Sequence, residues 1–201
     1  MNYGEESLCV LAPLWIEARA LRPALRGVEV AHFGMGARCA RSAAEIITQR
    51  RPAPGAVAVA GVCGSLHARF APGDVVVATE LRGAGKPRPL ESAKPLARAL
   101  EARGIPVALG PIHSLDHLAR RAERESLAAA GALAVDMESA WLGELADSLP
   151  FAVLRVVSDG PGHALFSPRI FANGIRALRA LRAAAPALER WATTHSLEGH
   201  S

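Results

Sequence analysis

The 201-residue sequence predicts a single α/β domain, in which helices cover both faces of a largely parallel sheet. Short apolar runs alternate with helical patterns from one end of the chain to the other, which is typical of strand–helix–strand units. The sequence contains neither an internal repeat nor a linker that would mark a second domain. We therefore expect one domain over residues 1–192 and a disordered tail over residues 193–201.

Each expected element follows from a local pattern. Short apolar runs between turn residues predict strands, at residues 8–12, 28–33, 56–60, 75–81, 106–112, 132–135 and 151–157. Helical spacing of apolar residues predicts helices, at residues 17–25, 34–50, 93–103, 116–130 and 138–147. A last, long helix is expected after residue 167 and runs to about residue 191. Pro13 precedes the first helix, Pro52 follows the second, and Asp116 is a candidate N-cap for the fourth. We expect a turn at residues 61–64 and a mobile loop over the Gly/Pro-rich residues 82–91.

The composition excludes several classes of protein. Half of the residues are apolar and only 4% are aromatic, so the core is expected to consist of Ala, Val and Leu. The net charge of +4 is modest, and no basic patch with interleaved aromatic residues suggests nucleic-acid binding. The three cysteines are far apart without a C-x-x-C pair, which argues against a disulfide framework or a zinc site. With no signal-peptide pattern and no apolar run of the ~18 residues a span needs, we expect a cytoplasmic protein.

Two acidic side chains come directly after apolar strands. Glu138 follows the run Ala134–Met137, and Asp159 follows Leu154–Ser158. A carboxylate in such a position costs stability unless it is hydrogen-bonded or used. One predicted helix separates the two, so both acids are expected at the same edge of the parallel sheet. Ligands bind at that edge in open α/β sheets, and the sequence therefore predicts a site there.

Five local patterns, in order, resemble the purine nucleoside phosphorylase/nucleosidase superfamily. They are Gly34-Met35-Gly36, AGVCGSL at residues 60–66, PGDVVV at 72–77, VDMES at 135–139 and RVVSD at 155–159. Within the superfamily, the chain is similar to the methylthioadenosine/S-adenosylhomocysteine nucleosidase branch. The sequence around ALAVDMES most resembles the bacterial hopanoid-associated phosphorylase-type proteins. The resemblance implies a three-layer α/β/α fold around a mixed sheet and cleavage of the N-glycosidic bond of a purine, adenine-type nucleoside. It also implies no metal or cofactor and a homodimer or larger assembly.

The resemblance assigns two catalytic roles. Asp159 matches the acid that protonates N7 of the leaving purine, and Ser158 beside it would orient that acid or contact the base. Glu17 matches the carboxylate that orients the attacking water. The alternatives are a turn-capping role for Asp159 and, for Glu17, a solvent-exposed helix position paired with Arg19 or Arg22.

Substrate-binding residues are also carried over from the resemblance. Glu138 would accept hydrogen bonds from the ribose 2′- and 3′-hydroxyls, unless it only stabilises the start of a helix. Met137 would pack against the nucleoside, and Asp136 receives no catalytic role. Further candidates for the sugar and base pocket are Gly61, Ser114, Leu118 and Ala119.

The attacking group, water or phosphate, is the open question. Backbone N–H groups at Gly34, Gly36 and Gly64 would suit an anion or a water molecule, and Arg38 offers a cation for phosphate. The residues before the second glycine pattern carry no cation, however, and Glu17 would repel a dianion. The balance favours hydrolysis, with phosphorolysis, including that of adenosylhopane, as the alternative.

Three rival functions are less consistent with the residues. A nucleotide-binding oxidoreductase needs G-x-G-x-x-G, but Cys39 stands where the third glycine belongs. A non-catalytic nucleoside-binding protein would not need both Glu138 and Asp159. A hydrolase using Cys63 and a nearby histidine conflicts with an apolar turn, where a cysteine is expected to be inert packing.

Overall fold

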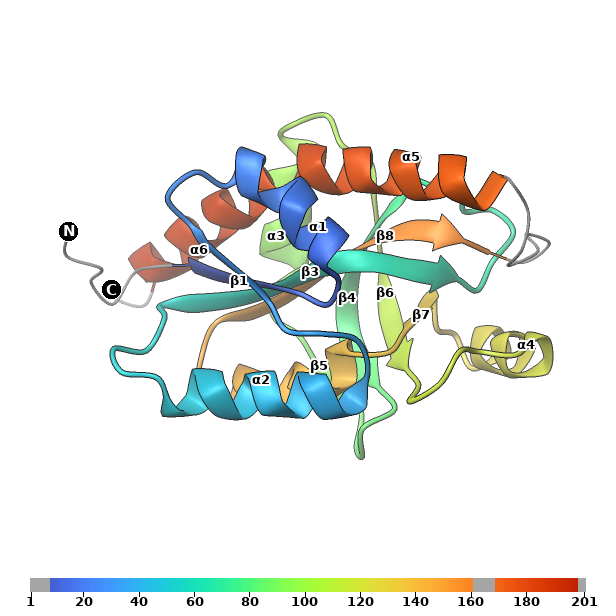
Figure 1. Ribbon diagram of the computed structural model, residues 1–201, viewed down its shortest axis with the longest axis horizontal. Helices are drawn as coiled ribbons and strands as arrows, with labels where there is room; N and C mark the ends of the chain where they lie inside the picture. The colour runs from blue at the N-terminus through green and yellow to red at the C-terminus, as the bar shows by residue number, and fades with distance from the viewer. Residues whose placement is uncertain (1–7, 161–168, 199–201) are drawn as a thin grey trace.

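The computed structural model describes residues 8–160 and 169–198 of the chain. Figure 1 shows a central sheet between two layers of helices, with α1 and α5 on one side and α2 on the other. The expected three-layer α/β/α architecture is therefore confirmed. No helix in the described ranges is long and apolar enough to span a membrane.

Eight strands form the sheet, namely β1 (Leu8–Ala12), β2 (Glu29–His32), β3 (Ala56–Ser65), β4 (Val75–Arg82), β5 (Arg88–Pro89), β6 (Val107–Ser114), β7 (Ala134–Asp136) and β8 (Phe151–Asp159). The α-helices are α1 (Trp15–Leu21), α2 (Ala37–Gln49), α3 (Ala93–Glu101), α4 (Arg121–Ala129), α5 (Arg169–Ala184) and α6 (Pro186–Glu198). Two 3-10 helices complete the described elements, η1 (Arg22–Ala24) and η2 (Ser139–Asp147).

The sheet consists of two parallel blocks joined by antiparallel pairs. Strands β2, β1, β3 and β8 are parallel, and so are β4, β6 and β7. The blocks join where β4 pairs with β8 and where β7 pairs with β3, both antiparallel. Consecutive pairings thus close a ring through β3, β8, β4, β6 and β7. In that ring Gly64 of β3 lies between Asp159 of β8 and Val135 of β7.

This pairing corrects one expectation about the site. We predicted that Glu138 and Asp159 would share the edge of one parallel sheet. Instead, β7 and β8 run in opposite directions and are brought together by β3, which pairs with both. The two acids converge because the ring closes, a long-range event that local patterns do not report.

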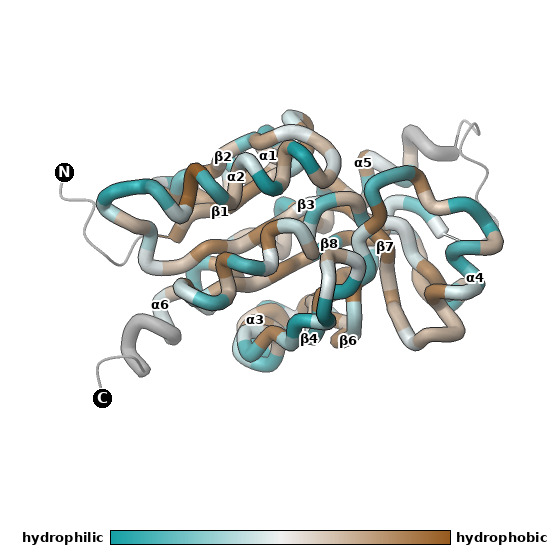
Figure 2. The backbone as a smooth tube through the Cα atoms, turned by 90° about the horizontal axis from the view of Figure 1, so that it is seen from below, coloured by the Kyte–Doolittle hydropathy of each residue, from teal (hydrophilic) through white to brown (hydrophobic). Residues whose placement is uncertain are grey.

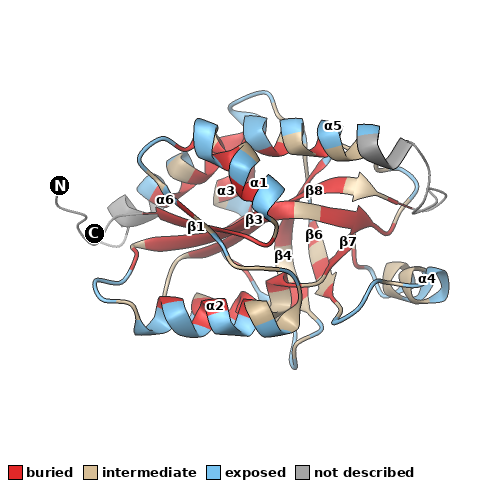
Figure 3. Ribbon diagram, viewed as in Figure 1, coloured by how far each residue is buried: buried red, intermediate tan, exposed pale blue. Residues whose placement is uncertain are grey.

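The core has two halves, one on each face of the sheet. Successive residues of β1 point to opposite faces, as a strand requires. Val10 belongs to the core half that includes residues of α1, α3, α5 and α6, whereas Leu11 belongs to the half that includes residues of α2 and η2. Figure 3 shows buried strands beneath helices whose outer faces are exposed. In Figure 2 the hydrophobic segments follow the strands. This alternation holds the sheet between two helical layers and fixes the strand ends that form the site.

Four local expectations were wrong. Residues 61–64 are not a turn, because β3 continues through them and pairs with β8, with a register shift at Cys63 and Gly64. The fourth helix begins at Arg121 rather than at Asp116, and a short strand, β5, lies within the expected loop at 82–91. The long C-terminal helix is divided at Pro186, which cannot donate a backbone hydrogen bond and so begins a new helix.

The new helix also changes the end of the expected domain. Helix α6 continues to Glu198, so residues 193–198 are helical where a disordered tail was expected. Residues 199–201 lie outside the described residues.

Candidate active site

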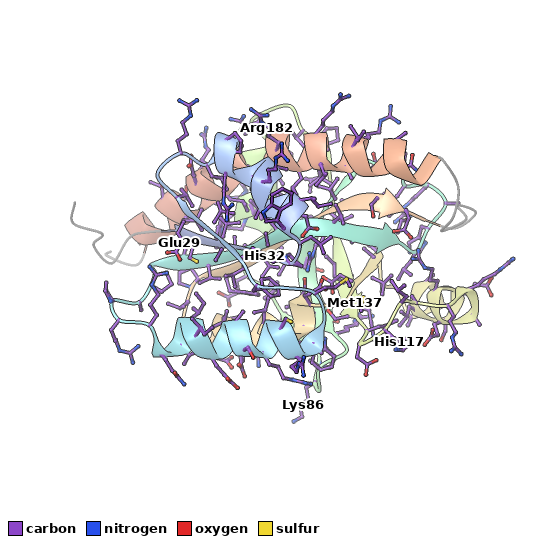
Figure 4. All side chains as sticks on the ribbon, viewed as in Figure 1. Glu29, His32, Lys86, His117, Met137 and Arg182 are labelled. Carbon is purple, nitrogen blue, oxygen red and sulfur yellow. The ribbon has the colours of Figure 1, made fainter. Side chains whose placement is uncertain are left out.

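A cleft opens at the meeting point of β3, β7 and β8, beside the start of α1 and the loop before α4. Its empty volume is about 590 Å³, including the open mouth. Figure 4 places Met137 between α2 and β3, with His117 beside α4. The lining residues are Pro13, Leu14, Glu17, Met35, Val62, Cys63, Gly64, His117, Leu118, Ala119, Arg124, Val135, Asp136, Met137, Glu138, Ser158 and Asp159.

Most of the predicted site residues line this cleft. Glu17, Glu138 and Asp159 meet there, although the sequence positions them more than 100 residues apart at the extremes. Met137, Ser158, Leu118, Ala119 and Gly64 also line it. The geometry therefore brings the three candidate carboxylates to one cavity, which is the requirement that their proposed roles share.

Glu17 is buried at the inner end of the cleft. Its Oε2 accepts a hydrogen bond of 2.7 Å from the Leu14 N–H, and its Oε1 accepts one of 2.7 Å from the Val62 N–H. Only 1% of the residue is exposed, and this burial raises the pKa of the carboxyl group above its usual value, against the opposing effect of Arg155. The alternative of an exposed helix residue paired with Arg19 or Arg22 is therefore wrong.

Glu138 lies beside Glu17 and is fixed from two sides. The Gly36 N–H donates to Oε1 at 3.0 Å, and the Arg155 Nη2 lies 3.4 Å from Oε2. Burial raises the pKa of Glu138, while Arg155 opposes the shift and Asp136 adds to it. The Met137 N–H also donates to Oε2 at 3.4 Å. The carboxylate is therefore oriented, and Oε1, with one hydrogen bond, keeps acceptor capacity for a ligand.

A buried arginine joins these acids, and the sequence analysis did not single it out. Arg155 of β8 is fully buried, with Nη2 at 2.8 Å from the Asp136 carboxylate and 3.0 Å from the Ser139 hydroxyl. Asp136 also accepts the backbone N–H groups of Glu138 and Ser139. Asp136 thus fixes both the Arg155 guanidinium and the backbone at Glu138 and Ser139. An arginine inside the apolar run LRVV was the available signal, because a buried charge needs partners.

One atom of this arginine is unpaired. Arg155 Nη1 is buried and has no hydrogen-bond partner within residues 8–160 and 169–198. A Cβ atom placed on Gly61 would lie 2.6 Å from this nitrogen and 2.7 Å from Glu17 Oε1. The two groups therefore both lie against Gly61, and a glycine is needed there because any side chain would displace them.

Asp159 stands at the outer end of the cleft in a different environment. Its Oδ2 accepts a hydrogen bond of 2.7 Å from Arg124 Nη2, and its Oδ1 accepts one of 3.2 Å from the Ser158 hydroxyl. The Asp159 side chain retains 19% of its accessible surface. Sequence reasoning missed Arg124, because it is one of three arginines within residues 120–124 and nothing in the local pattern distinguishes it.

Five of the predicted residues act differently from the expectation or lie outside the cleft lining, namely Gly34, Gly36, Arg38, Gly61 and Ser114. Ser114 is buried and donates to Asp136, so it supports the acid cluster and does not contact the base pocket. Arg38 is exposed and is not among the cleft-lining residues. Gly34 and Gly36 have positive φ angles of 99° and 90°, which favour glycine, and the Gly36 N–H is engaged by Glu138. These glycines shape the loop and orient Glu138, and the Gly36 N–H is not free for an anion.

Cys63 lines the cleft but does not behave as a nucleophile. It is 4% exposed, and burial raises the pKa of its thiol well above the usual value. A cysteine nucleophile needs a thiolate, which a positive environment favours and an apolar one disfavours. The geometry gives no support to the cysteine-hydrolase reading.

Similarities to known proteins agree with this architecture. A structure of a Helicobacter pylori methylthioadenosine/S-adenosylhomocysteine nucleosidase mutant with 5′-methylthioadenosine in its active site superposes with a TM-score of 0.77 at 17% identity, covering 95% of this chain and 99% of that chain. The native futalosine hydrolase of Helicobacter pylori gives 0.75 at 18% identity, covering 96% and 100%. A structure from Francisella philomiragia, described as that of a methylthioadenosine/S-adenosylhomocysteine nucleosidase, gives a TM-score of 0.73 at 18% identity. It covers 92% of this chain and 98% of that chain.

At these identities the superpositions establish the fold, and the sequence pattern of the family establishes membership. No curated protein matches the chain significantly in sequence. The pattern that defines the Phosphorylase superfamily, however, matches residues 25–184, which include Gly34, Glu138 and Asp159. The chain therefore belongs to the phosphorylase superfamily.

Proposed function

We propose that the protein cleaves the N-glycosidic bond of a purine nucleoside, with water as the attacking group. The observation that carries the proposal is the inner cluster of Glu17, Glu138 and Arg155, where an unpaired buried guanidinium N–H and a carboxylate oxygen both lie against Gly61. A buried unpaired donor calls for a small polar partner. A water molecule held between Arg155 Nη1 and Glu17 would meet that need and be oriented for attack.

The other two acids complete the chemistry. As the bond between C1′ and N9 breaks, its electron pair goes to the base and the sugar gains oxocarbenium character. Glu138 would accept hydrogen bonds from the ribose hydroxyls, and its negative charge favours the positive sugar. Asp159 would give a proton to N7 of the departing base, and the water would add to C1′ while Glu17 accepts its proton. A positioned general acid typically contributes ~10²–10⁴ to the rate.

The same cluster disfavours phosphate as the attacking group. Phosphorolysis requires a dianion to be held, usually by arginine and backbone amides. Arg38 is exposed and outside the cleft lining, and Arg155 is already surrounded by Asp136 and Glu138. A dianion next to Glu17 and Glu138 would be repelled.

The rim of the cleft favours an apolar 5′ substituent. Met35 and Leu118, which both line the cleft, are 57% and 66% exposed. Large exposed apolar side chains beside a pocket provide a surface that an apolar group can cover. We therefore expect the substrate to be an adenine-type nucleoside with an apolar 5′ substituent, for example methylthioadenosine or adenosylhopane. A homo-oligomeric state and a cytoplasmic location stay predictions.

Product analysis tests the proposal directly. The protein is incubated with adenosine, methylthioadenosine and adenosylhopane, with and without phosphate, and the products are separated by chromatography. We expect free adenine and free sugar at a rate that phosphate does not change. If sugar 1-phosphate formed, and only when phosphate was present, the reaction would be phosphorolysis and the proposal of hydrolysis would be wrong. Tight nucleoside binding without any base release would indicate a non-catalytic binding protein.

A further inference from the structure

The second arginine of the cleft, Arg124, comes from an element that has little packing of its own. Helix α4 has no buried residue, and only a small cluster around Leu66, Ala132 and Val135 lies beneath it. The Arg124 side chain is nevertheless 17% exposed. It is directed inward, where Nη2 donates to Asp159 Oδ2 at 2.7 Å and Nη1 donates to the Ser65 carbonyl at 3.3 Å.

Asp159 depends on this contact for its orientation. Among the described residues, its carboxylate has one other hydrogen bond, the 3.2 Å contact from the hydroxyl of its neighbour Ser158. A carboxylate at the end of a strand, held by one long hydrogen bond, can rotate out of the cleft. The forked guanidinium fixes it at a charge-assisted distance, while its second nitrogen is tied to the backbone of β3.

Gly64 provides the room for the arginine. A Cβ atom at this position would lie 2.9 Å from Arg124 Nη2 and 3.0 Å from Nη1. Gly64 pairs with Asp159 across β3 and β8. The glycine therefore admits the guanidinium to a position directly beside the acid, which is a more specific role than offering its N–H to an anion.

The loop before α4 is held in place by a histidine. His117 Nδ1 lies 2.7 Å from the Asp116 carboxylate, and Nε2 lies 2.8 Å from that of Glu123. Glu123 also accepts the Arg120 N–H at 2.8 Å, at the start of the helix. These contacts fix the first turn of α4, from which Arg124 extends.

We propose that Arg124 is a positioning residue, which holds Asp159 in the cleft and acts on the substrate only through that acid. The proposal rests on the proposed function, in which Asp159 is the proton donor. Helix α4 is then the element that presents the arginine to the site.

Substitution of Arg124 separates positioning from binding. For Arg124→Met we expect kcat to fall by about 10- to 100-fold, because misplacing a catalytic group by about 1 Å can cost that much, with KM changed less than about threefold. Arg124→Lys keeps the charge but loses the fork and should recover part of the rate. Gly64→Ala, which displaces the guanidinium without removing it, should lower kcat in the same way. Arg121→Met is the matched control, because Arg121 is on the same helix, is 93% exposed and pairs only with Glu125 among the described residues.

Two kinetic results would overturn the proposal. One is a kcat for Arg124→Met equal to that of Arg121→Met, and the other is a loss confined to KM, which would mean direct contact with the substrate. Crystal structures of the wild type and Arg124→Met give a readout that needs no turnover: Asp159 should face the cleft in the first and leave it in the second. An unmoved Asp159 would reject the positioning role even if the wild type cleaved no nucleoside, whereas an inactive wild type with a displaced Asp159 in the variant would reject the proposed function alone.

Discussion

The two ends of the cleft hold their acids in opposite ways. At the inner end, Glu17, Glu138 and Asp136 surround a fully buried arginine, and every contact comes from the sheet or from segments packed on it. At the outer end, Asp159 is partly exposed and paired with an arginine from a surface helix. A buried charge cluster is rigid, because moving one member leaves another unpaired. A partly exposed pair can change at a smaller cost, because water can take the place of a lost partner.

The difference indicates a division of labour. Under the proposed function, the inner end would hold the sugar and the attacking group, whose geometry is common to all nucleosides. The outer end would face the base, and it depends on a peripheral element, α4. We expect substitutions at the inner end to affect stability and substitutions at the outer end to affect turnover.

The largest effect is expected for Arg155→Met. This change leaves Asp136, Glu138 and Glu17 without their common cation, and breaking a buried ion pair from one side costs about 3–5 kcal/mol. Urea denaturation at neutral pH would measure the loss in the free energy of unfolding. Arg98→Met, at an exposed position of α3, is the control. If both variants lost the same small amount, the inner end would not be the rigid one.

Asp159→Asn should give the opposite result. We expect turnover of purine nucleosides to fall by ~10² or more, because the proton donor is gone. The free energy of unfolding should fall by less than it does for Arg155→Met, because Asp159 is partly exposed. Steady-state kinetics and urea denaturation measure the two quantities. Asp147→Asn, which removes an exposed acid paired with Arg88, should alter neither. Near-normal turnover of the Asp159 variant would eliminate the proposed acid.

Glu138→Gln sharpens the comparison within the inner end. A carboxylate that accepts hydrogen bonds from the ribose should matter for ribosides and not for a free base. We expect the affinity for a nucleoside to fall by about tenfold or more and the affinity for adenine to stay within about twofold, both measured by calorimetry. Equal losses for the two ligands would contradict the ribose role.

The smallest effect is a dependence of stability on pH. Burial raises the pKa of Glu17 and Glu138 in the folded protein, so the folded state binds protons more tightly than the unfolded state does. Their contribution is present below the unfolded value of about 4.5 and is lost as the pH rises through the raised folded value, at up to about 1.4 kcal/mol per pH unit per group. Urea denaturation between pH 5 and 8 should show this decline, and Glu17→Gln should flatten it. A profile identical in the two proteins would contradict the assignment.

Much of the fold follows from short patterns in the chain. The alternation of apolar runs with helical spacing gave the α/β class, and residues such as Val10 and Leu11 report the two faces of a strand without any tertiary information. The positions of Glu138 and Asp159 after apolar runs also follow from the pattern alone. The failures are local and physical: β3 continues through the glycines at 61 and 64 because neighbouring strands pair with it, and this pairing overrides the turn preference of glycine.

The class of fold, the alternating core and the acids at the strand ends therefore follow from the order of residues in the chain. Which cations pair with those acids depends on the folded arrangement. Arg155 meets Glu138 because the ring of strands closes, and Arg124 meets Asp159 because Gly64 leaves room for it. Partners in the chain are separated by as many as 102 residues, as for Gly36 and Glu138, and contacts over such distances depend on strand pairing, which no local pattern encodes.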